Sequence, residues 1–305
     1  MSASDGCPPP LPPSPPTPAP LVGVRATLSI GLTIALVVSL LLIRANWRQL
    51  CRAPSTTQCC GESSKARTLL LGFRLACGVW HCAVTLGLLI RKASDHAECP
   101  DVTHPWFFSL FFYTVWNYLL QAVFWFTATA ASAASLLHSA VAPRRLRTAV
   151  HLLLSICLPS AILVSVVLWG VLLPNDIRHG HPEREENFFS YNMHAVNTVC
   201  LLAEFFFNRL TMMPGAFGAF LAWVWLYAIF CWCQNAVTGF WPYFFLVLDT
   251  WAAVGWYLGL FALNAVAYLV ARLFSRLKVR WTPSLAADQE SSEGMLQAHD
   301  EERLR

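Results

Sequence analysis

Long apolar runs alternate with short polar segments along the chain. Seven runs each hold about 18 or more residues with few charges. An α-helix of that length, at 1.5 Å per residue, crosses a hydrocarbon core of roughly 30 Å. The pattern predicts an all-α fold, a polytopic transmembrane helix bundle of about seven spans. The expected spans are Ala26–Ile43, Thr68–Ile90, Trp106–Ala131, Ala149–Leu173, Phe189–Leu210, Ala216–Gln234 and Trp251–Phe274.

Two polar segments lie on either side of these spans. Residues 1–25 are rich in proline and are expected to form a disordered, polyproline-like tail. They lack the basic start of a cleavable signal peptide, so the first span is expected to be an uncleaved anchor. Residues 279–305 are acidic and are also expected to be disordered. The transmembrane helical domain is predicted at residues 26–278.

Composition supports a membrane protein. The chain is 56% hydrophobic and 12% charged, whereas a soluble domain is about 25% charged. Zinc-finger spacings and basic recognition helices are absent from the sequence, so no nucleic-acid partner is predicted. The eleven cysteines do not form a disulfide pattern, because most lie inside apolar runs, where cysteine acts as a small hydrophobe.

Basic residues predict the orientation, because cytosolic loops of membrane proteins carry an excess of lysine and arginine. Fifteen lysine and arginine residues follow the first and third spans, end the fifth span, or lie in the C-terminal region. The segments on the opposite side of the membrane hold five basic residues: Arg25, Arg91, Lys92, Arg178 and Arg184. The bias predicts an N-terminus outside or in the lumen and a C-terminus in the cytosol. Whether the membrane is the endoplasmic reticulum or the plasma membrane is left open.

Four polar side chains are predicted at a common depth on the non-cytosolic side. With the third span starting near Trp106 and the fifth near Phe189, Thr114 lies roughly 12 Å and His194 roughly 8 Å inside. The sixth span ends on the same side with Gln234 and Asn235. Ionisable groups inside a membrane are costly and usually functional. These four side chains are therefore candidates for lining one cavity.

Such a layer contains the parts of an acyl-transfer site. A hydroxyl nucleophile needs a base within hydrogen-bond reach, and Thr114 with His194 forms the smallest such pair. Gln234 or Asn235 could supply donors to an oxyanion. A second interpretation is structural, because membrane threonines usually bond their own helix and a single histidine often joins two helices. The residues alone leave both open.

Other polar groups have structural interpretations. Asn197 and Glu204 are seven residues apart and share a helix face. Asn197 is expected to give polar support, and Glu204 to pair with Arg74 or Arg209 near the cytosolic end. His81 is expected to act as a donor between helices.

Neither a metal site nor a ligand cage is predicted. His81, His194 and Glu204 lie at different depths and cannot share a metal. Four aromatic side chains fit a belt at the membrane surface better than a cage: Trp106, Trp241, Trp251 and Tyr243.

Three motifs point to a known family. They are Asn192–His194 with Glu204 ten residues later, Val237–Trp241 followed by an aromatic Pro-Tyr-Phe stretch, and Thr114–Trp116 with Leu120–Phe124. From about Thr68 to Lys278 the chain resembles the androgen-induced family of multispanning membrane proteins. The chain resembles that family's rolling-stone-like and plant branches more closely still. They carry His-x-x-Asn and Trp-Trp-Pro-Tyr, similar to His194, Asn197 and Phe240–Tyr243 here.

The resemblance implies a lipid-ester hydrolase. Animal members of the family are threonine hydrolases that cleave fatty acid esters of hydroxy fatty acids, using one intramembrane threonine and one histidine. By motif these fall on Thr114 and His194. The implied partners are a membrane lipid substrate and the bilayer, with no cofactor; protein partners are not predicted.

Two alternatives remain beside the hydrolase. Where animal hydrolases carry histidines before Val-Thr-Gly, this chain has Gln234 and Asn235. The rolling-stone-like branch is linked with cell fusion and membrane organisation, which makes a non-enzymatic membrane protein the first alternative. Seven spans with an external N-terminus give a transporter or receptor as the second, weaker one.

Overall fold

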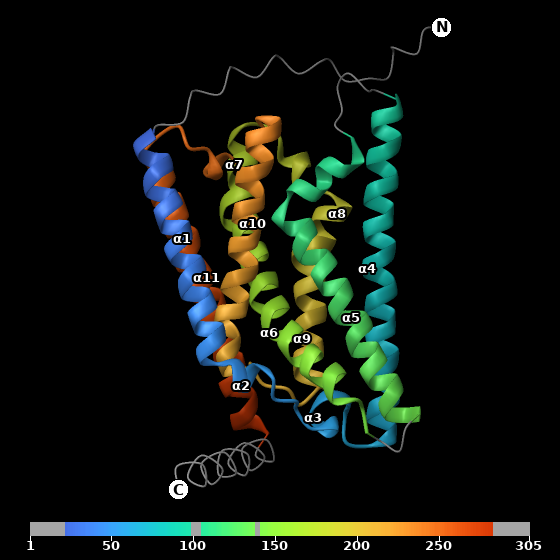
Figure 1. The fold of residues 1–305 in the computed structure, drawn as a ribbon. Coiled ribbons are helices and arrows are strands. Elements are labelled where there is room, and N and C mark those ends of the chain that lie inside the picture. The colour runs from blue at the N-terminus through green and yellow to red at the C-terminus, as the bar shows by residue number, and fades with distance from the viewer. Residues whose placement is uncertain (1–21, 99–104, 138–140, 283–305) are drawn as a thin grey trace, which may run out of the picture.

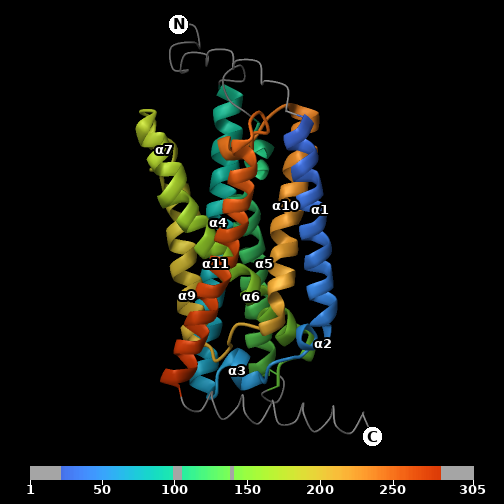
Figure 2. The same ribbon diagram turned by 90° about the vertical axis from the view of Figure 1, so that its left-hand side faces the viewer.

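The structure, a computed structural model, describes residues 22–98, 105–137 and 141–282. Within these residues the chain is helical, without strands, and its long helices run along one bundle (Figure 1). The first helix begins at one end of the bundle and the last finishes at the other (Figures 1 and 2). The predicted all-α transmembrane bundle is confirmed. Most of both predicted tails lies outside the described residues.

Six described helical stretches are long and apolar enough to span a membrane. They are α1 (Val22–Ala45), α4 (Ser64–Glu98), α5 (Tyr113–Leu137), the stretch Arg144–Arg178, α10 (Phe217–Thr238) and α11 (Ala252–Trp281). The stretch Arg144–Arg178 consists of α6 (Arg144–Val167), the π-helical turn η2 (Leu168–Leu172) and α7 (Leu173–Arg178). Helices α1 and α11 extend a few residues into the segments predicted as tails.

The remaining pass is the predicted span 189–210, and it is not one regular helix. It consists of α8 (Phe188–Tyr191), the π-helical turn η4 (Asn192–Val196) and α9 (Asn197–Phe207). A π-turn is rare and is found mostly within α-helices at functional sites. Here it carries His194, so the helix is widened where the candidate base lies.

Short elements close the two ends of the bundle. One end holds α2 (Trp47–Leu50), α3 (Thr56–Cys60) and η5 (Pro214–Ala216). The other holds the 3₁₀ turns η1 (Trp106–Phe111), η3 (Pro182–Arg184) and η6 (Phe244–Leu246). The third predicted span therefore differs from the observed one: residues 106–111 form η1, and α5 begins only at Tyr113. Thr114 lies in the first turn of its helix rather than two turns inside it.

Helix α6 lies at the centre of the bundle and packs against α5, α9, α10 and α11. Its side chains are apolar or small over most of its length, so it can be buried on every side. Pro159 lies inside it, and Pro174 follows η2. Because proline has no backbone N–H, each removes one helical hydrogen bond, and the wide turn η2 comes just before the second.

Helix α1 lies on the outside, against α10. Their close approach depends on Gly218, because a Cβ at that position would lie only 2.9 Å from the carbonyl oxygen of Ser39. Small residues at helix contacts are how membrane helices gain van der Waals packing in the absence of a hydrophobic drive.

Candidate active site

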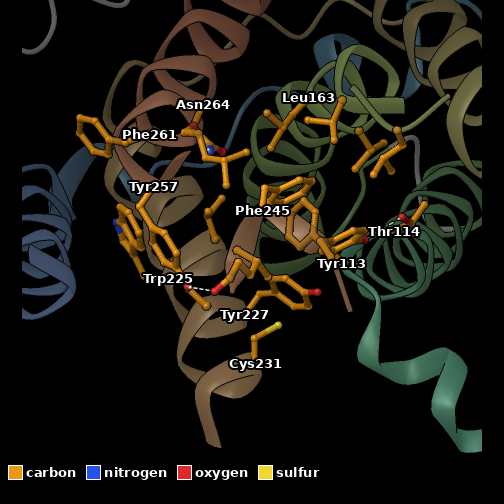
Figure 3. A pocket seen from close by; sticks show the side chains of 18 of the residues that line it. Tyr113, Thr114, Leu163, Trp225, Tyr227, Cys231, Phe245, Tyr257, Phe261 and Asn264 are labelled. Carbon is orange, nitrogen blue, oxygen red and sulfur yellow. Dashed lines mark hydrogen bonds between the residues drawn. The ribbon is translucent and has the colours of Figure 1, made fainter. Parts of the chain in front are cut away.

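A partly open cavity with roughly 780 Å³ of empty space is lined by α5, α6, η4, α10, α11 and the loop before α11. Most of its wall is apolar, including Leu163, Phe245 and Phe261 (Figure 3). The few polar side chains that reach it include both Thr114 and His194. The structure therefore brings the predicted nucleophile and base to the same cavity.

The hydroxyl of Thr114 is not used by its own helix. Other threonines in the spans donate to the carbonyl four residues earlier, as Thr85, Thr127 and Thr129 do. In the described chain the Thr114 hydroxyl instead contacts the hydroxyl of Tyr243 at 3.4 Å. The carbonyl of Leu110, four residues before Thr114, accepts from the indole of Trp116 at 2.7 Å. The structural interpretation, in which this hydroxyl serves the helix backbone, does not describe Thr114.

Tyr243 is a site residue that sequence reasoning missed. It was expected in an aromatic belt, but its side chain lines the cavity. Its hydroxyl interacts with both the hydroxyl and the backbone N–H of Thr114, and burial raises the pKa of Tyr243 to about 12, so it stays a neutral donor. The first N–H groups of a helix carry partial positive charge. Tyr243 and the start of α5 therefore gather donors around Thr114.

The histidine is held in one tautomer. Nδ1 of His194 lies 3.1 Å from the carbonyl oxygen of Val164, and because a carbonyl only accepts, Nδ1 must donate. The neutral ring then keeps its lone pair on Nε2, the form that accepts a proton. The backbone carbonyl of His194 accepts from Ser165 and, at 3.0 Å, from Thr198. Within the described residues no hydrogen bond joins Thr114 and His194 directly.

The three predicted supporting amides do not line the cavity. Gln234 donates to Thr238, and Asn235 donates to the carbonyl of Phe240 at 3.1 Å. Both lie in the last turns of α10, which ends where Gly239 adopts φ +70°, and their amides bond residues at this helix end. Asn197 is buried beside the cavity, and its carbonyl oxygen accepts from Thr198 at 3.1 Å.

The structure pairs Glu204 with Arg74, one of its two predicted partners. Both side chains are fully buried, and Nε of Arg74 lies 3.0 Å from Oε1 of Glu204. The remaining guanidinium donors reach Ser132 at 2.6 Å and the carbonyl of Cys59 at 2.7 Å. Asn208 donates to Glu204 at 3.0 Å. This network joins α4, α5 and α9 away from the cavity and has a structural geometry.

The described residues contain no group of three histidine, cysteine or acidic side chains placed to hold a metal ion. The polar groups around the cavity are hydroxyls, one imidazole, the amide of Asn264, the thiol of Cys231 and the indole of Trp225. Hydroxyl and imidazole groups together suit acid–base and nucleophilic chemistry.

A model of the family described as FAR-17a/AIG1-like protein matches residues 76–276, about two thirds of the chain. The chain belongs to the FAR-17a/AIG1-like family. This is the androgen-induced family that the motifs predicted. The match includes Thr114, His194 and Tyr243, and it leaves α1 and Arg74 outside. No curated protein and no solved structure matches the chain.

Proposed function

We propose that this FAR-17a/AIG1-like protein hydrolyses a lipid ester inside the membrane, with Thr114 as nucleophile and His194 as base. The hydroxyl of Thr114 carries this assignment, because it lies free of its own helix at the edge of an apolar cavity that His194 also lines. Long-chain esters, such as fatty acid esters of hydroxy fatty acids, are the substrate class that the apolar wall and the family resemblance support.

In the first half-reaction Oγ1 of Thr114 attacks the ester carbonyl carbon, and its proton passes to Nε2 of His194. The two side chains line one cavity without a direct hydrogen bond, and catalytic hydrogen bonds of this kind commonly tighten only when substrate is bound. The tetrahedral oxyanion lies against the Tyr243 hydroxyl and the backbone N–H of Thr114, which the Tyr243 hydroxyl already contacts. His194 then returns the proton to the leaving alcohol oxygen, and the acyl group stays on Thr114. In the second half-reaction water replaces the alcohol, and the fatty acid leaves.

The test is labelling by a fluorophosphonate probe of detergent-solubilised protein. Wild type and Thr114→Ser should label at Thr114 or at the serine that replaces it. Thr114→Val keeps the volume but removes the hydroxyl, and it should abolish labelling. His194→Gln should slow labelling roughly 10²–10⁴-fold, the usual contribution of a general base.

Two matched controls separate chemistry from folding. Thr129→Val makes the same change on the same helix, at a hydroxyl bonded to its own backbone. His151→Gln removes a histidine that bonds the carbonyl of Thr211, outside the cavity lining. Both should label as wild type does. Absence of labelling in a folded wild type would favour the non-enzymatic alternative, in which these polar groups only hold helices together.

A further inference from the structure

A second group of polar side chains lies between α4, α5 and the start of α9, and the proposed reaction does not use it. We name it the polar core; its members are His81, Asn117, Tyr118, Gln121 and Asn197. Each is at most 1% exposed. The His81 ring stacks on Tyr118, with 4.3 Å between ring centroids, and Nε2 of His81 lies 3.3 Å from Oε1 of Gln121.

Several polar atoms of the polar core have no hydrogen-bond partner among the described residues. Both amide atoms of Asn117, the hydroxyl of Tyr118, Nε2 of Gln121 and Nδ2 of Asn197 are buried without a partner in the described chain. Each such atom costs about 1–3 kcal/mol. Native proteins normally satisfy atoms of this kind with ordered water, which needs two to four polar partners. The five unsatisfied atoms of the polar core, on neighbouring helices, are partners that such water would satisfy.

The polar core continues the faces that carry the candidate reactive pair. On α5, Thr114, Asn117 and Gln121 are spaced i, i+3 and i+7, so they lie on one side of the helix. On the facing pass, Asn197 follows His194 by three residues, and α5 packs against η4. Polar groups therefore extend from the cavity toward the middle of the bundle, while the cavity wall itself is apolar.

We propose that the polar core binds a cluster of ordered waters and supplies from it the water that hydrolyses the acyl group on Thr114, an inference that rests on the proposed ester hydrolysis. One water gives a proton to Nε2 of His194 and attacks the acyl carbonyl carbon. The bond to Oγ1 of Thr114 breaks, Oγ1 takes that proton back, and the fatty acid leaves. The apolar acyl chain fills the cavity during this step, so water reaches the carbonyl from the side that the chain does not occupy.

Separate measurement of the two half-reactions tests this route. Asn117→Leu and Asn197→Leu replace the amides by apolar groups of similar volume, and Tyr118→Phe removes one hydroxyl only. We expect fluorophosphonate labelling at Thr114 within about threefold of wild type, but ester turnover at least tenfold slower. Intact mass spectrometry should then show the acyl group accumulating on Thr114. Asn46→Leu is the matched control, since its amide already donates to the Leu42 carbonyl at the opposite end of the bundle.

Each alternative result has a distinct meaning. Labelling and turnover that are both unchanged, or that fall together without an acyl-enzyme, overturn water supply by the polar core. A wild type that does not label overturns the ester hydrolysis and, with it, this supply role.

Thermal unfolding in detergent then tests separately whether the polar core binds water. Replacing a buried amide that has no partner should raise the Tm, whereas replacing an amide that binds water should lower it. We expect Asn117→Leu to lower the Tm. A raised Tm would exclude water bound at Asn117.

Discussion

Among the residues of the cavity, Thr114 and Tyr243 form the contact that most limits what chemistry is possible. A threonine that bonded its own backbone would have its hydroxyl proton committed to that bond, as at Thr129. The Thr114 hydroxyl has only a long contact with Tyr243, at 3.4 Å. An incoming carbonyl oxygen can therefore take over the Tyr243 donor as Thr114 attacks, because no strong bond has to be broken first.

Tyr243→Phe tests the oxyanion assignment at the scale of one atom. The ring and its packing remain, and only the hydroxyl that contacts Thr114 is lost. Removal of one oxyanion donor typically lowers kcat by about 10²–10³-fold, and we expect a loss in that range with KM little changed. Tyr191→Phe, at a tyrosine that is 40% exposed, is the control. A rise in KM at constant kcat would instead make Tyr243 a substrate-binding residue.

Glu185, in the loop before α8, predicts a pH dependence of stability. Burial raises the pKa of the Glu185 carboxyl to about 7, and Asp176 adds to the rise. Between about pH 4.5 and 7 the folded protein holds a proton that the unfolded chain releases, so folding weakens as pH increases through this window. We expect Glu185→Gln to unfold as wild type does at pH 5. At pH 8 it should be more stable by on the order of 1–3 kcal/mol.

Thermal unfolding in detergent at the two pH values measures this difference. Glu183→Gln is the control, because the side chain of Glu183 is 69% exposed and its pKa is lowered rather than raised, chiefly by a backbone hydrogen bond, so this substitution should not stabilise the protein at pH 8. Parallel melting curves for wild type and Glu185→Gln would mean that the Glu185 carboxylate is solvated in the folded protein.

At the scale of the helices, the apolar runs predicted where the chain passes through the bundle, because each pass needs a minimum apolar length. They did not predict the turn η4, because a π-turn leaves no trace in hydrophobic periodicity, yet it decides where His194 lies. Thr114 and His194 were placed in one layer by sequence. Tyr243 was not, because it comes from a loop, and aromatic loop residues look alike whether they face lipid or a cavity. Gln234 and Asn235 share that layer, but the end of α10 uses their amides.

The ion pair between α4 and α9 predicts a large effect on stability. Glu204→Gln leaves the guanidinium of Arg74 buried without its counter-ion, and breaking a buried pair in this way costs about 3–5 kcal/mol. Replacing both partners, as in Arg74→Met with Glu204→Met, should recover most of that loss because no charge remains buried. Yield and Tm in detergent give the readout. Glu62→Gln is the control, since Glu62 is 64% exposed in its pair with Arg209, and an exposed pair contributes about 0–1 kcal/mol.

For the whole molecule, the two ends of the bundle differ in charge and in chemistry. The loops around α2 and α3 and the ends of α5, α9 and α11 lie at one end, with most of the basic residues. Thr114, at the start of α5, and Tyr243, before α11, lie toward the other end. If the basic end is cytosolic, as the charge bias predicts, the candidate site lies nearer the outer or lumenal face. Product and water would then exchange on that side.

Glycosylation can decide this orientation, because the natural sequence contains no Asn-x-Ser/Thr acceptor and so gives no background. An acceptor within a flexible Gly/Ser-rich insertion after Gly180 should be glycosylated in cells, since the loop between α7 and α8 is predicted outside. The same insertion after Arg52 should not be, because that loop lies at the basic end. The readout is an electrophoretic shift that a glycosidase removes. Glycan on the Arg52 insertion alone would reverse the orientation and place the Thr114 end of the bundle on the cytosolic side, so that product and water would exchange with the cytosol.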